Sequence, residues 1–496
     1  MPGASWTIEI DWNNDGDWSD TGEDVTARVL NRPGIVMERG RDQVRALAPP
    51  MAGRGEFALD NTSGDYSPAN TGSPLYGNLL PGRAVRVRST TIVGGTVWRG
   101  TLDDLPQEPF AAGGGRVRAP ALGTLAKLKG VAVWTELHSN TQTSDAFAAV
   151  CAAAGLAASE YSALDTGQTT LTHWWCAGDD AFAMLVKILA AEGPGAAIYE
   201  QGDGTIRFHS RHYRLLTSRC TTAQATFGDG ATEPKHSPPF AYQPNLKNVV
   251  NGAALETRVL TLAGAATDLQ TFTLDPAVTL YPSESVDIPI QLSAVADWES
   301  TPGNMETPDL TFEGASGAYS TTADRLSGQA FTLTVTSAAT FPITFSAVTI
   351  RGYASTTTTV PVANTVDTSA SQARYGARSL PSGWTPWPYI DAATARAFCN
   401  AIVTSYQEPR ATVAVTVKGA NTTRLTQMLS REISDRIAVD ESQTGFSGDV
   451  YIERIRHDIR EGGRFHTTTF GCEEAGPHGD WYVVGTSLVG TGRAGF

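Results

Sequence analysis

The sequence predicts an α+β protein that is mostly β, in which two all-β modules bracket a small helical α+β module and an all-β insert. Three observations support this prediction. Short runs of alternating apolar and polar residues recur between Gly, Pro, Asn and Asp. Two alanine-rich helical patterns lie near the middle, and a Thr-rich stretch of strand-like runs follows them. At 496 residues the chain is long enough for roughly three to four domains.

Residues 1–130 are predicted to form the N-terminal β-module. Its seven strand candidates are separated by turn residues and lie at 6–10, 24–30, 34–41, 55–61, 84–92, 96–104 and 115–122. Valines and arginines alternate from Ala84 to Arg88, so one face of that strand is expected to meet solvent. Strands at this density favour a barrel or a sandwich.

Residues 131–215 are predicted to form the helical α+β module. One helix is capped by Thr143 or Ser144 and ends at Gly155, and a second ends at Gly193 before a proline. A hairpin follows, with strands at 197–199 and 205–208 around a Gly-Asp-Gly turn.

Residues 216–370 are predicted to form a Thr-rich, acidic, all-β insert. Within 251–370 the sequence has twelve acidic residues and three arginines, a net charge of −9. Such an excess is either kept in water or matched to a basic partner. We therefore expect the insert to lie on the outside of any assembly.

Residues 371–475 are predicted to form a second β-module, and residues 476–496 a tail. The module opens with a helix that Asp391 caps and Pro409 ends, because its apolar residues follow helical spacing. Its last element is a long hairpin that turns at Gly462 and Gly463.

The composition excludes several classes of protein. A net charge of −14 disfavours a surface that tracks phosphates, so no stable nucleic-acid binding is expected. No run approaches the ~18 apolar residues of a membrane span, and the N-terminus lacks the basic and apolar regions of a secretory signal. The five cysteines are scattered and are expected to be buried free thiols. No P-loop, GxSxG or HExxH motif is present, which favours a protein that is not an enzyme.

A dense run of acidic residues near the N-terminus is the main candidate for a metal site. Asp11, Asn13 and Asp15 alternate before a glycine, as the oxygen ligands do in the first half of a calcium loop. The backbone carbonyl of Asp17 would be the next ligand. The candidate ligands of a structural Ca²⁺ are Asp11, Asn13, Asp15, Asp17, Asp20 and Glu23.

The run departs from a complete calcium loop at its end. Gly22 stands where a bidentate glutamate is expected, so Asp20, Glu23 or Asp24 would have to replace it. The flanking segments are also strands rather than helices. A structural Ca²⁺ and a solvated acidic turn therefore both stay open.

Two histidine pairs are weaker candidates. His209 and His212 are expected to lie on the surface, on opposite faces of a strand end. His457 and His466 lie across the predicted C-terminal hairpin, where they could pair, and no third metal ligand is evident. Five tryptophans could stack on sugars but are expected to pack at domain edges and subunit contacts: Trp134, Trp174, Trp175, Trp384 and Trp387.

Six short motifs follow one another along the chain: Asp60-Asn61 through Tyr66-Ser67-Pro68, Pro74-Leu75-Tyr76-Gly77, Arg374-Tyr375-Gly376, Pro409-Arg410, Asp435-Arg436-Ile437 and Tyr451-Ile452-Glu453. Their order resembles that of the tail hub of tailed bacteriophages, a minor tail protein also called the baseplate hub. The resemblance covers residues 1–250 and 360–475.

The resemblance implies two tube-like β-barrel modules per chain and a homotrimeric ring at the tail tip, without catalysis. The C-terminal module would pack beside the N-terminal module of a neighbouring chain. The ring would close the tail tube and adapt its sixfold symmetry to a threefold tip. Implied partners are the tail tube or distal tail protein, the tape measure protein and other tail-tip proteins. The protein would be made in the host cytoplasm and reside in the virion, and DNA would pass through the ring.

Two other functions also fit parts of the sequence. The acidic loop, the tryptophans and the Thr-rich insert also fit a secreted, calcium-stabilised carbohydrate-binding or adhesin-like protein, which the missing secretory signal disfavours. A cell-wall hydrolase of the tail tip is disfavoured because no catalytic motif is present and little sequence follows the second β-module.

Overall fold

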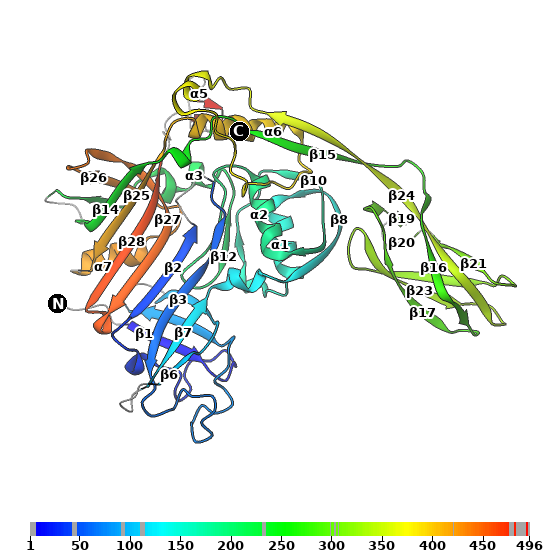
Figure 1. Cartoon of the computed structure of the whole chain (residues 1–496), viewed down its shortest axis with the longest axis horizontal. Coiled ribbons are helices and arrows are strands. Elements are labelled where there is room, and N and C mark those ends of the chain that lie inside the picture. Colours follow the sequence, from blue (N-terminus) through cyan, green and yellow to red (C-terminus); the bar gives the residue numbers. More distant parts are fainter. Residues whose placement is uncertain are drawn as a thin grey trace.

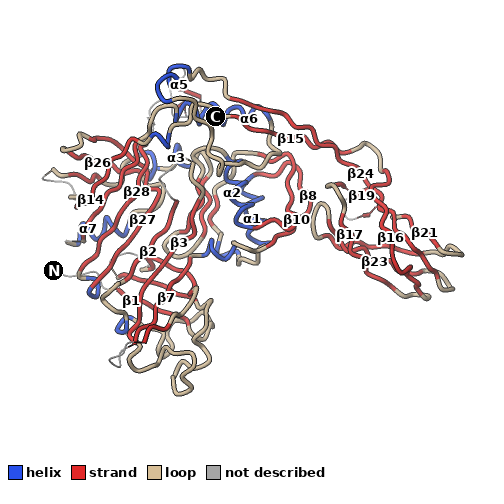
Figure 2. The backbone as a smooth tube through the Cα atoms, in the orientation of Figure 1, coloured by secondary structure: helices blue, strands red, loops and turns tan. Residues whose placement is uncertain are grey.

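The computed structural model describes residues 6–41, 47–90, 95–109, 115–230, 235–297, 299–301, 304–305, 307–419, 421–475, 481–482 and 493–494. It confirms a mostly-β α+β protein with several antiparallel sheets. Figure 1 shows a β-rich body, helices beside it, and a long arm that extends to the right. Strands predominate throughout, and the helices are short and lie mainly near the centre and top of the view (Figure 2).

One sheet of 13 strands contains strands from both predicted β-modules. Its N-terminal part runs in the order β1 (Trp6–Asp11), β4 (Ala84–Ser89), β5 (Thr96–Leu102), β7 (Gly115–Leu122), β3 (Pro50–Asp60) and β2 (Ile35–Arg41). Its C-terminal part continues with β27 (Phe446–Arg460), β28 (Phe465–Glu474), β25 (Ala411–Lys418) and β14 (Ser237–Pro244). Three more strands pair off this path: β6 (Gln107–Pro109), β13 (Thr226–Gly228) and β26 (Arg436–Glu441).

Neither predicted barrel is closed by a continuous strand ladder in the described part of the chain. In the N-terminal module the reason is the stretch 24–30, which was predicted as a strand but contains the 3-10 turn η1 (Thr26–Arg28). This stretch still spans the gap between β1 and β3. The amide of Val25 donates to the carbonyl of Ile8 at 3.0 Å, and the amide of Leu30 donates to the carbonyl of Ala58 at 2.8 Å.

In the C-terminal module an isolated bridge joins Gly228 to Lys235, between β13 and β14. Both strands lie within the stretch 216–370, so that stretch contributes to the large sheet as well as to the arm. One apolar core centres on the N-terminal module and also includes Leu425, Leu429 and Ile459, and a second core centres on the C-terminal module. In most strands alternate residues point into these cores. Val85 and Val87 are buried on one face of β4 while Arg88 is exposed on the other, as the alternation predicted.

The helical module packs two helices against a two-stranded sheet of β8 (Ala132–Gln142) and β10 (Thr170–Asp180). Helix α1 (Thr143–Ala153) begins without a side-chain cap, so the predicted cap at Thr143 or Ser144 is wrong. Helix α2 (Ala181–Glu192) is capped by Asp180 and ends at Gly193 as predicted. The module also contains η3 (Ala158–Glu160), β9 (Ala163–Leu164), β11 (Ala197–Glu200) and β12 (Ile206–His209), and η2 (Thr124–Leu128) precedes it at the end of the N-terminal module.

The arm is built on one long strand, β24 (Ile343–Ala363). Near the body β24 pairs with β15 (Ala254–Leu262), and farther out it pairs with β16 (Thr267–Leu280) and β21 (Asp309–Phe312). A second sheet contains β17 (Ser285–Gln291), β23 (Ala330–Ser337) and β22 (Tyr319–Arg325). Shorter strands are β18 (Ala296–Asp297), β19 (Glu299–Thr301) and β20 (Asn304–Met305).

Helix α6 (Ala392–Tyr406) confirms the predicted cap, since the carboxylate of Asp391 accepts from the amides of Ala393 and Thr394. The helix packs on the helical module: a side chain at Gly193 would lie 2.6 Å from the ring of Phe398. The remaining elements are α3 (Tyr213–Leu216), α4 (Ser218–Thr221), η4 (Leu246–Asn248), α5 (Ser369–Tyr375), α7 (Thr422–Ser430), η5 (Glu461–Gly463), β29 (Trp481–Tyr482) and β30 (Arg493–Ala494).

All five cysteines are buried free thiols, as predicted. The tryptophans Trp174, Trp384 and Trp387 are buried at the contact between the helical module and the segment before α6, whereas Trp134 is partly exposed. Across the ranges that the structure describes, no helix is long and apolar enough to cross a membrane.

Candidate functional site

The two β-modules lie side by side within one chain because β2 pairs antiparallel with β27. The ladder runs from Ile35 opposite Ile459 to Gly40 opposite Arg454. Gly40 has a φ of +113°, and a Cβ atom there would stand 2.1 Å from the carbonyl oxygen of Glu453. Glycine is therefore required at this position, where the two backbones come closest.

A buried carboxylate joins three parts of the chain at this junction. Glu453 on β27 is 0% exposed and forms ion pairs with Arg41 of β2 at 2.7 Å and Arg214 of α3 at 2.7 Å. Burial by itself raises the pKa of Glu453, but the two guanidinium groups outweigh it and hold that pKa below the ordinary value. The carboxylate is therefore charged, and it depends on both arginines to be so.

A second carboxylate extends this network toward α6. Glu473 on β28 accepts a hydrogen bond from Arg41 at 2.8 Å and another from the hydroxyl of Tyr406 at 2.6 Å. Arg410 lies 3.7 Å away. A single arginine of the N-terminal module thus binds acidic groups on two strands of the C-terminal module.

Glu200 of β11 ties the helical module to the N-terminal module. Its carboxylate accepts hydrogen bonds from the amides of Gly53 at 2.7 Å and Leu125 at 2.5 Å. A Cβ atom at Gly53 or Gly123 would overlap this carboxylate, at 2.2 and 1.9 Å. Burial raises the pKa of Glu200 to about 7, although the two amides oppose the shift.

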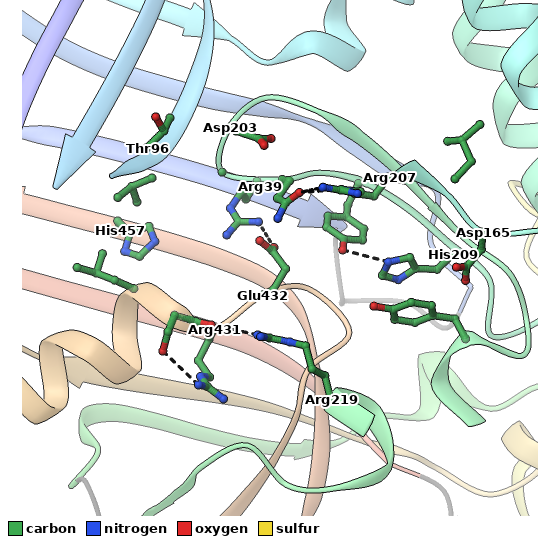
Figure 3. Close-up of a pocket in the computed structure, with 18 residues that line it drawn as sticks. Arg39, Thr96, Asp165, Asp203, Arg207, His209, Arg219, Arg431, Glu432 and His457 are labelled. Atoms are coloured by element: carbon green, nitrogen blue, oxygen red, sulfur yellow. Dashed lines mark hydrogen bonds and ion pairs between the residues drawn. The ribbon is translucent and has the colours of Figure 1, made fainter. Parts of the chain in front are cut away.

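A cavity of about 650 Å³ lies where the three modules meet (Figure 3). Its lining combines basic, acidic and aromatic groups: Arg39, Arg207, Arg219, Arg431, Asp165, Asp203, Glu432, Tyr199, Tyr213, His209 and His457, among others. Figure 3 shows that Arg39 comes from β2, Arg207 from the β11–β12 hairpin and Glu432 from the loop after α7. Arg39 forms an ion pair with Glu432 across two modules.

His209 lines this cavity, so the prediction that it lies on the surface is wrong. It is buried, stacks on Tyr213 with ring centroids 3.4 Å apart, and shares a hydrogen bond of 3.2 Å with the hydroxyl of Tyr199. Strand β12 ends against α3, and that packing covers the ring. Burial, together with the positive charges of the nearby Arg214 and Arg207, lowers the pKa of His209 to about 3.

His457 and His466 pair across the C-terminal hairpin, as predicted. Their rings share a hydrogen bond of 3.1 Å between Nδ1 and Nε2, and Thr468 lies 2.9 Å from the same Nδ1. Burial lowers the pKa of His466 to about 4 and lowers that of His457 well below its ordinary value. Within the described ranges, no group of three or more His, Cys, Asp or Glu side chains is arranged as a metal site.

The acidic loop after β1 brings the predicted metal ligands close together, but their groups bond to one another. The carboxylate of Asp11 accepts from the amides of Asp15 at 3.2 Å and Gly16 at 3.0 Å. The amide group of Asn13 donates to Asp15 at 2.9 Å and to Asp20 at 2.7 Å. Asp17 points elsewhere, since its carboxylate accepts from the amides of Trp18 and Ser19.

Glu23 is the exception within this loop. It is 2% exposed, and its Oε2 accepts from the amide of Asp20 at 3.2 Å while its Oε1 has no hydrogen-bond partner. Burial raises the pKa of Glu23, and the negative charges of Asp11, Asp20 and Asp15 raise it further. The loop therefore contains a buried carboxylate oxygen that no hydrogen-bond donor contacts.

The charged groups at the module junction are not evident from the sequence. Glu200 and Glu453 are single acids within strand-like runs, and their partners lie far away along the chain, 412 residues in the case of Glu453 and Arg41. The available signal was an acid among consecutive buried residues, as in Tyr451-Ile452-Glu453. Such a position implies a paired charge, but it does not identify the partner.

No protein-family model matches the chain, and no curated protein matches its sequence. Similar solved structures include the tail protein from Neisseria meningitidis MC58, with 9% sequence identity, a TM-score of 0.49, and coverage of 95% of this chain and 97% of that chain. The 43 kDa tail protein of prophage MuSo2 from Shewanella oneidensis has 10% identity, a TM-score of 0.47 and coverage of 94% and 98%. A prophage tail protein from Listeria monocytogenes EGD-e has 10% identity, a TM-score of 0.36 and coverage of 94% of each chain. The chain is thus similar to phage and prophage tail proteins along nearly its whole length, at scores too low to transfer a role or a residue.

Replacing Glu453 with Gln is expected to destabilise the junction strongly. The variant keeps the size of the side chain but leaves Arg214 without its carboxylate partner and Arg41 with Glu473 alone. Removing one partner of a buried ion pair costs about 3–5 kcal/mol of the free energy of unfolding. Chemical denaturation measures this loss, and Glu461→Gln in the exposed turn after β27 is the control. Equal stability of the two variants would contradict the proposed importance of the network.

The buried histidines are expected to make the protein less stable in acid. Their pKa values are lower in the folded chain than in the unfolded chain, so the unfolded state takes up protons first as the pH falls. The free energy of unfolding should decline from about pH 6.5, the unfolded value, to about pH 4, where His466 protonates in the folded state. At about 1.4 kcal/mol per pKa unit, His466 contributes roughly 3 kcal/mol of this decline.

Thermal denaturation of His466→Gln between pH 4 and 7 checks this expectation. The variant should show a shallower decline than the unchanged protein, and His212→Gln should not. Parallel curves for all three proteins would show that the pKa of His466 is the same in the folded and the unfolded protein.

Proposed function

We propose that this chain is a structural virion protein, one subunit of a homotrimeric hub at the distal end of a phage tail. The hub closes the tail tube and adapts its sixfold symmetry to a threefold tip, and it has no catalytic role. The observation that carries this proposal is the pairing of β2 with β27, which holds two β-modules side by side in one chain. The order of the six sequence motifs supports the same assignment.

Symmetry connects this pairing to the proposed role. A closed ring of three identical chains presents three copies of every surface. If each chain contains two similar modules, the ring presents six copies of the module surface. The two modules must then hold one spacing and one orientation. The β2–β27 ladder and the ion pairs of Arg41 and Glu453 supply that restraint, because charges buried in fixed geometry tolerate little displacement.

The arm supports a place for the insert outside the ring. Strand β24 carries the distal sheets away from the large sheet, on the far side of the helical module (Figure 1). The arm also holds most of the acidic excess of the chain. In this arrangement the arm contacts other tail-tip proteins, while the β-modules face the tail tube or distal tail protein and the tape measure protein, and DNA passes without stable binding.

Native mass spectrometry of the purified full chain tests the oligomeric state. A trimer is the expected species at micromolar concentration, and electron microscopy should show a ring of six similar densities. A chain that stays monomeric at high concentration, alone and with tail-tube protein, would overturn the proposal. Binding of such a monomer to cell-wall glycans would favour the carbohydrate-binding alternative instead.

An arm deletion tests the proposed place of the insert. Asp268 and Arg351 are opposite one another in the β16–β24 ladder, so residues 269–350 can be replaced by an Asn-Gly turn that joins them. The trimer should persist, with loss of tip assembly or infectivity. Loss of the trimer would show that the arm holds the ring together.

We also propose that the acidic loop binds a structural Ca²⁺. The support is the buried Oε1 of Glu23, which lacks a donor beside the carboxylates of Asp11, Asp15 and Asp20. A divalent cation would satisfy this oxygen and offset the repulsion among the acids. Asp17 would contribute its backbone carbonyl only.

Chelation tests the calcium proposal. A ligand that binds only the folded state stabilises it by mass action, so EDTA should lower the melting temperature and added Ca²⁺ should restore it. Asp15→Ala should abolish this response, and Asp324→Ala on the arm should keep it. Identical melting curves with and without EDTA would leave the loop as a solvated acidic turn.

A further inference from the structure

The cavity between the three modules is lined by more arginines than acids, and two of these arginines are nearly buried. Four arginines line it: Arg39, Arg207, Arg219 and Arg431. Arg207 donates to the neutral side chain of Gln201 at 2.7 Å. Of the lining acids, Asp165 accepts from the amide of Ser210 and Asp203 accepts from the amide of Thr205, so neither is hydrogen-bonded to an arginine.

Arg431 lacks hydrogen-bond acceptors for two of its three side-chain nitrogens. Its side chain is 9% exposed, its Nη2 donates to the hydroxyl of Ser430 at 3.1 Å, and its Nε and Nη1 have no hydrogen-bond partner. Burying an N–H group of a charged side chain without an acceptor costs free energy. Native proteins rarely leave buried N–H groups without an acceptor. Two such nitrogens on one guanidinium therefore indicate that an acceptor is absent.

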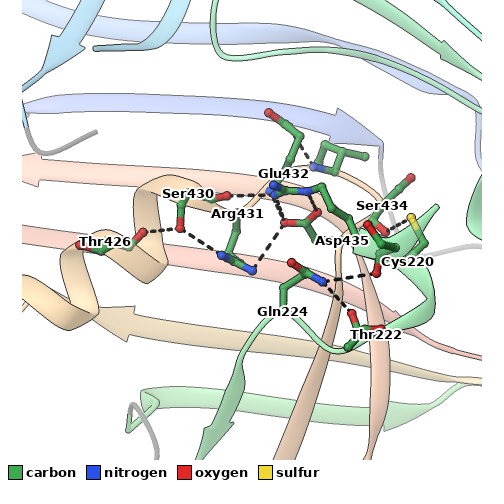
Figure 4. Close-up of polar contacts among 12 residues, drawn as sticks. Cys220, Thr222, Gln224, Thr426, Ser430, Arg431, Glu432, Ser434 and Asp435 are labelled. Carbon is green, nitrogen blue, oxygen red and sulfur yellow. Dashed lines mark hydrogen bonds and ion pairs between the residues drawn. The ribbon is translucent and has the colours of Figure 1, made fainter. Parts of the chain in front are cut away.

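The nearest carboxylate does not supply that acceptor. Asp435 lies 3.9 Å from Nη1 of Arg431, but it accepts two hydrogen bonds from Arg219, at 2.6 and 2.5 Å (Figure 4). Two guanidinium groups therefore share one carboxylate, which leaves a net positive charge. Burial lowers the pKa of Arg431, Asp435 opposes that shift, and the positive charge of Arg219 adds to it.

Arg39, which forms an ion pair with Glu432, is also buried with an unpaired nitrogen. Its side chain is 7% exposed, and its Nη1 bonds to Glu432 and to the backbone carbonyl of Glu200. Its Nε has no hydrogen-bond partner. Unpaired donors of two buried arginines therefore belong to side chains that line the same cavity, and those side chains come from different modules (Figure 3).

We propose that this cavity binds a phosphate group, with Arg431 and Arg39 as its principal ligands. A planar guanidinium offers parallel N–H donors that match the oxygens of phosphate, which makes arginine the usual ligand for this anion. The bound group would connect the loop after α7 to β2 and to the β11–β12 hairpin, and so would stabilise the three modules against one another. The source of the group is either free phosphate or the phosphoryl group of a larger molecule.

Isothermal titration calorimetry on the unchanged full-length protein tests the site with inorganic phosphate at constant ionic strength. We expect saturable binding of one phosphate per chain and a melting temperature that rises with occupancy. Arg431→Gln should weaken binding at least tenfold. Arg464→Gln, which removes an exposed arginine in the turn after β27, should bind as the unchanged protein does.

The variant Arg431→Lys distinguishes a loss of phosphate binding from a loss of folding. It keeps the positive charge but removes Nε and the fork, so it should fold and still bind phosphate more weakly. Absence of saturable binding by the unchanged protein would overturn the proposal. Equal affinity of Arg431→Gln and the unchanged protein would also overturn it.

A third titration distinguishes the two sources. Phosphoserine and glycerol phosphate carry the same phosphoryl group on a larger body. If either binds at least tenfold more tightly than inorganic phosphate, the site takes a phosphoryl group of a larger molecule. Equal or weaker binding of both would assign the site to free phosphate.

Discussion

The buried carboxylate of Glu453 between Arg41 and Arg214 is the interaction on which the arrangement of this protein depends. It connects the N-terminal module, the C-terminal module and α3 at one point, and no solvent reaches it. A charge in such a place is tolerated only while both partners stay in position. The relative placement of the three modules is therefore coupled to this one group.

Other polar side chains around the junction also form hydrogen bonds or ion pairs between modules. Glu200 bonds to backbone amides of the N-terminal module, Glu473 joins Arg41 to Tyr406, and Glu432 meets Arg39 at the cavity. Apolar contact alone permits modules to slide, because the hydrophobic effect has little directional preference. Hydrogen-bonded charges specify one orientation, which is what a ring of repeated modules would need.

The arm follows a different principle. A continuous ladder, in which β24 pairs first with β15 and then with β16, joins it to the body. Its second sheet also contacts the helical module, where the amide of Gly328 donates to the carbonyl of Thr135 at 3.2 Å and Arg325 lies 3.4 Å from Glu136. Threonines are frequent along that ladder, as in the run from Thr356 to Thr359, and its acids Glu256 and Asp268 face water. The arm therefore extends away from the large sheet, whereas the charged contacts at the junction fix the modules relative to one another.

Local features of the chain were predictable from the sequence alone. Alternation in β4, the cap of α6 by Asp391, the end of α2 at Gly193 and the pairing of His457 with His466 all follow from neighbours within a few residues or across one hairpin. Each depends on backbone geometry that short sequences specify directly. The mostly-β class follows from the same signals.

Only the tertiary structure decided how these elements combine. The stretch 24–30 has strand composition but spans β1 and β3 as a turn, and β13 and β14 pair with strands about 200 residues away. His209 has the sequence context of a surface residue but is buried because α3 packs over it. Alternation reports which face of a strand is apolar, yet it carries no information on which distant strand or charge will meet that face. The partner of Glu453 is chosen by the folded arrangement of three modules, so the junction and its cavity became visible only there.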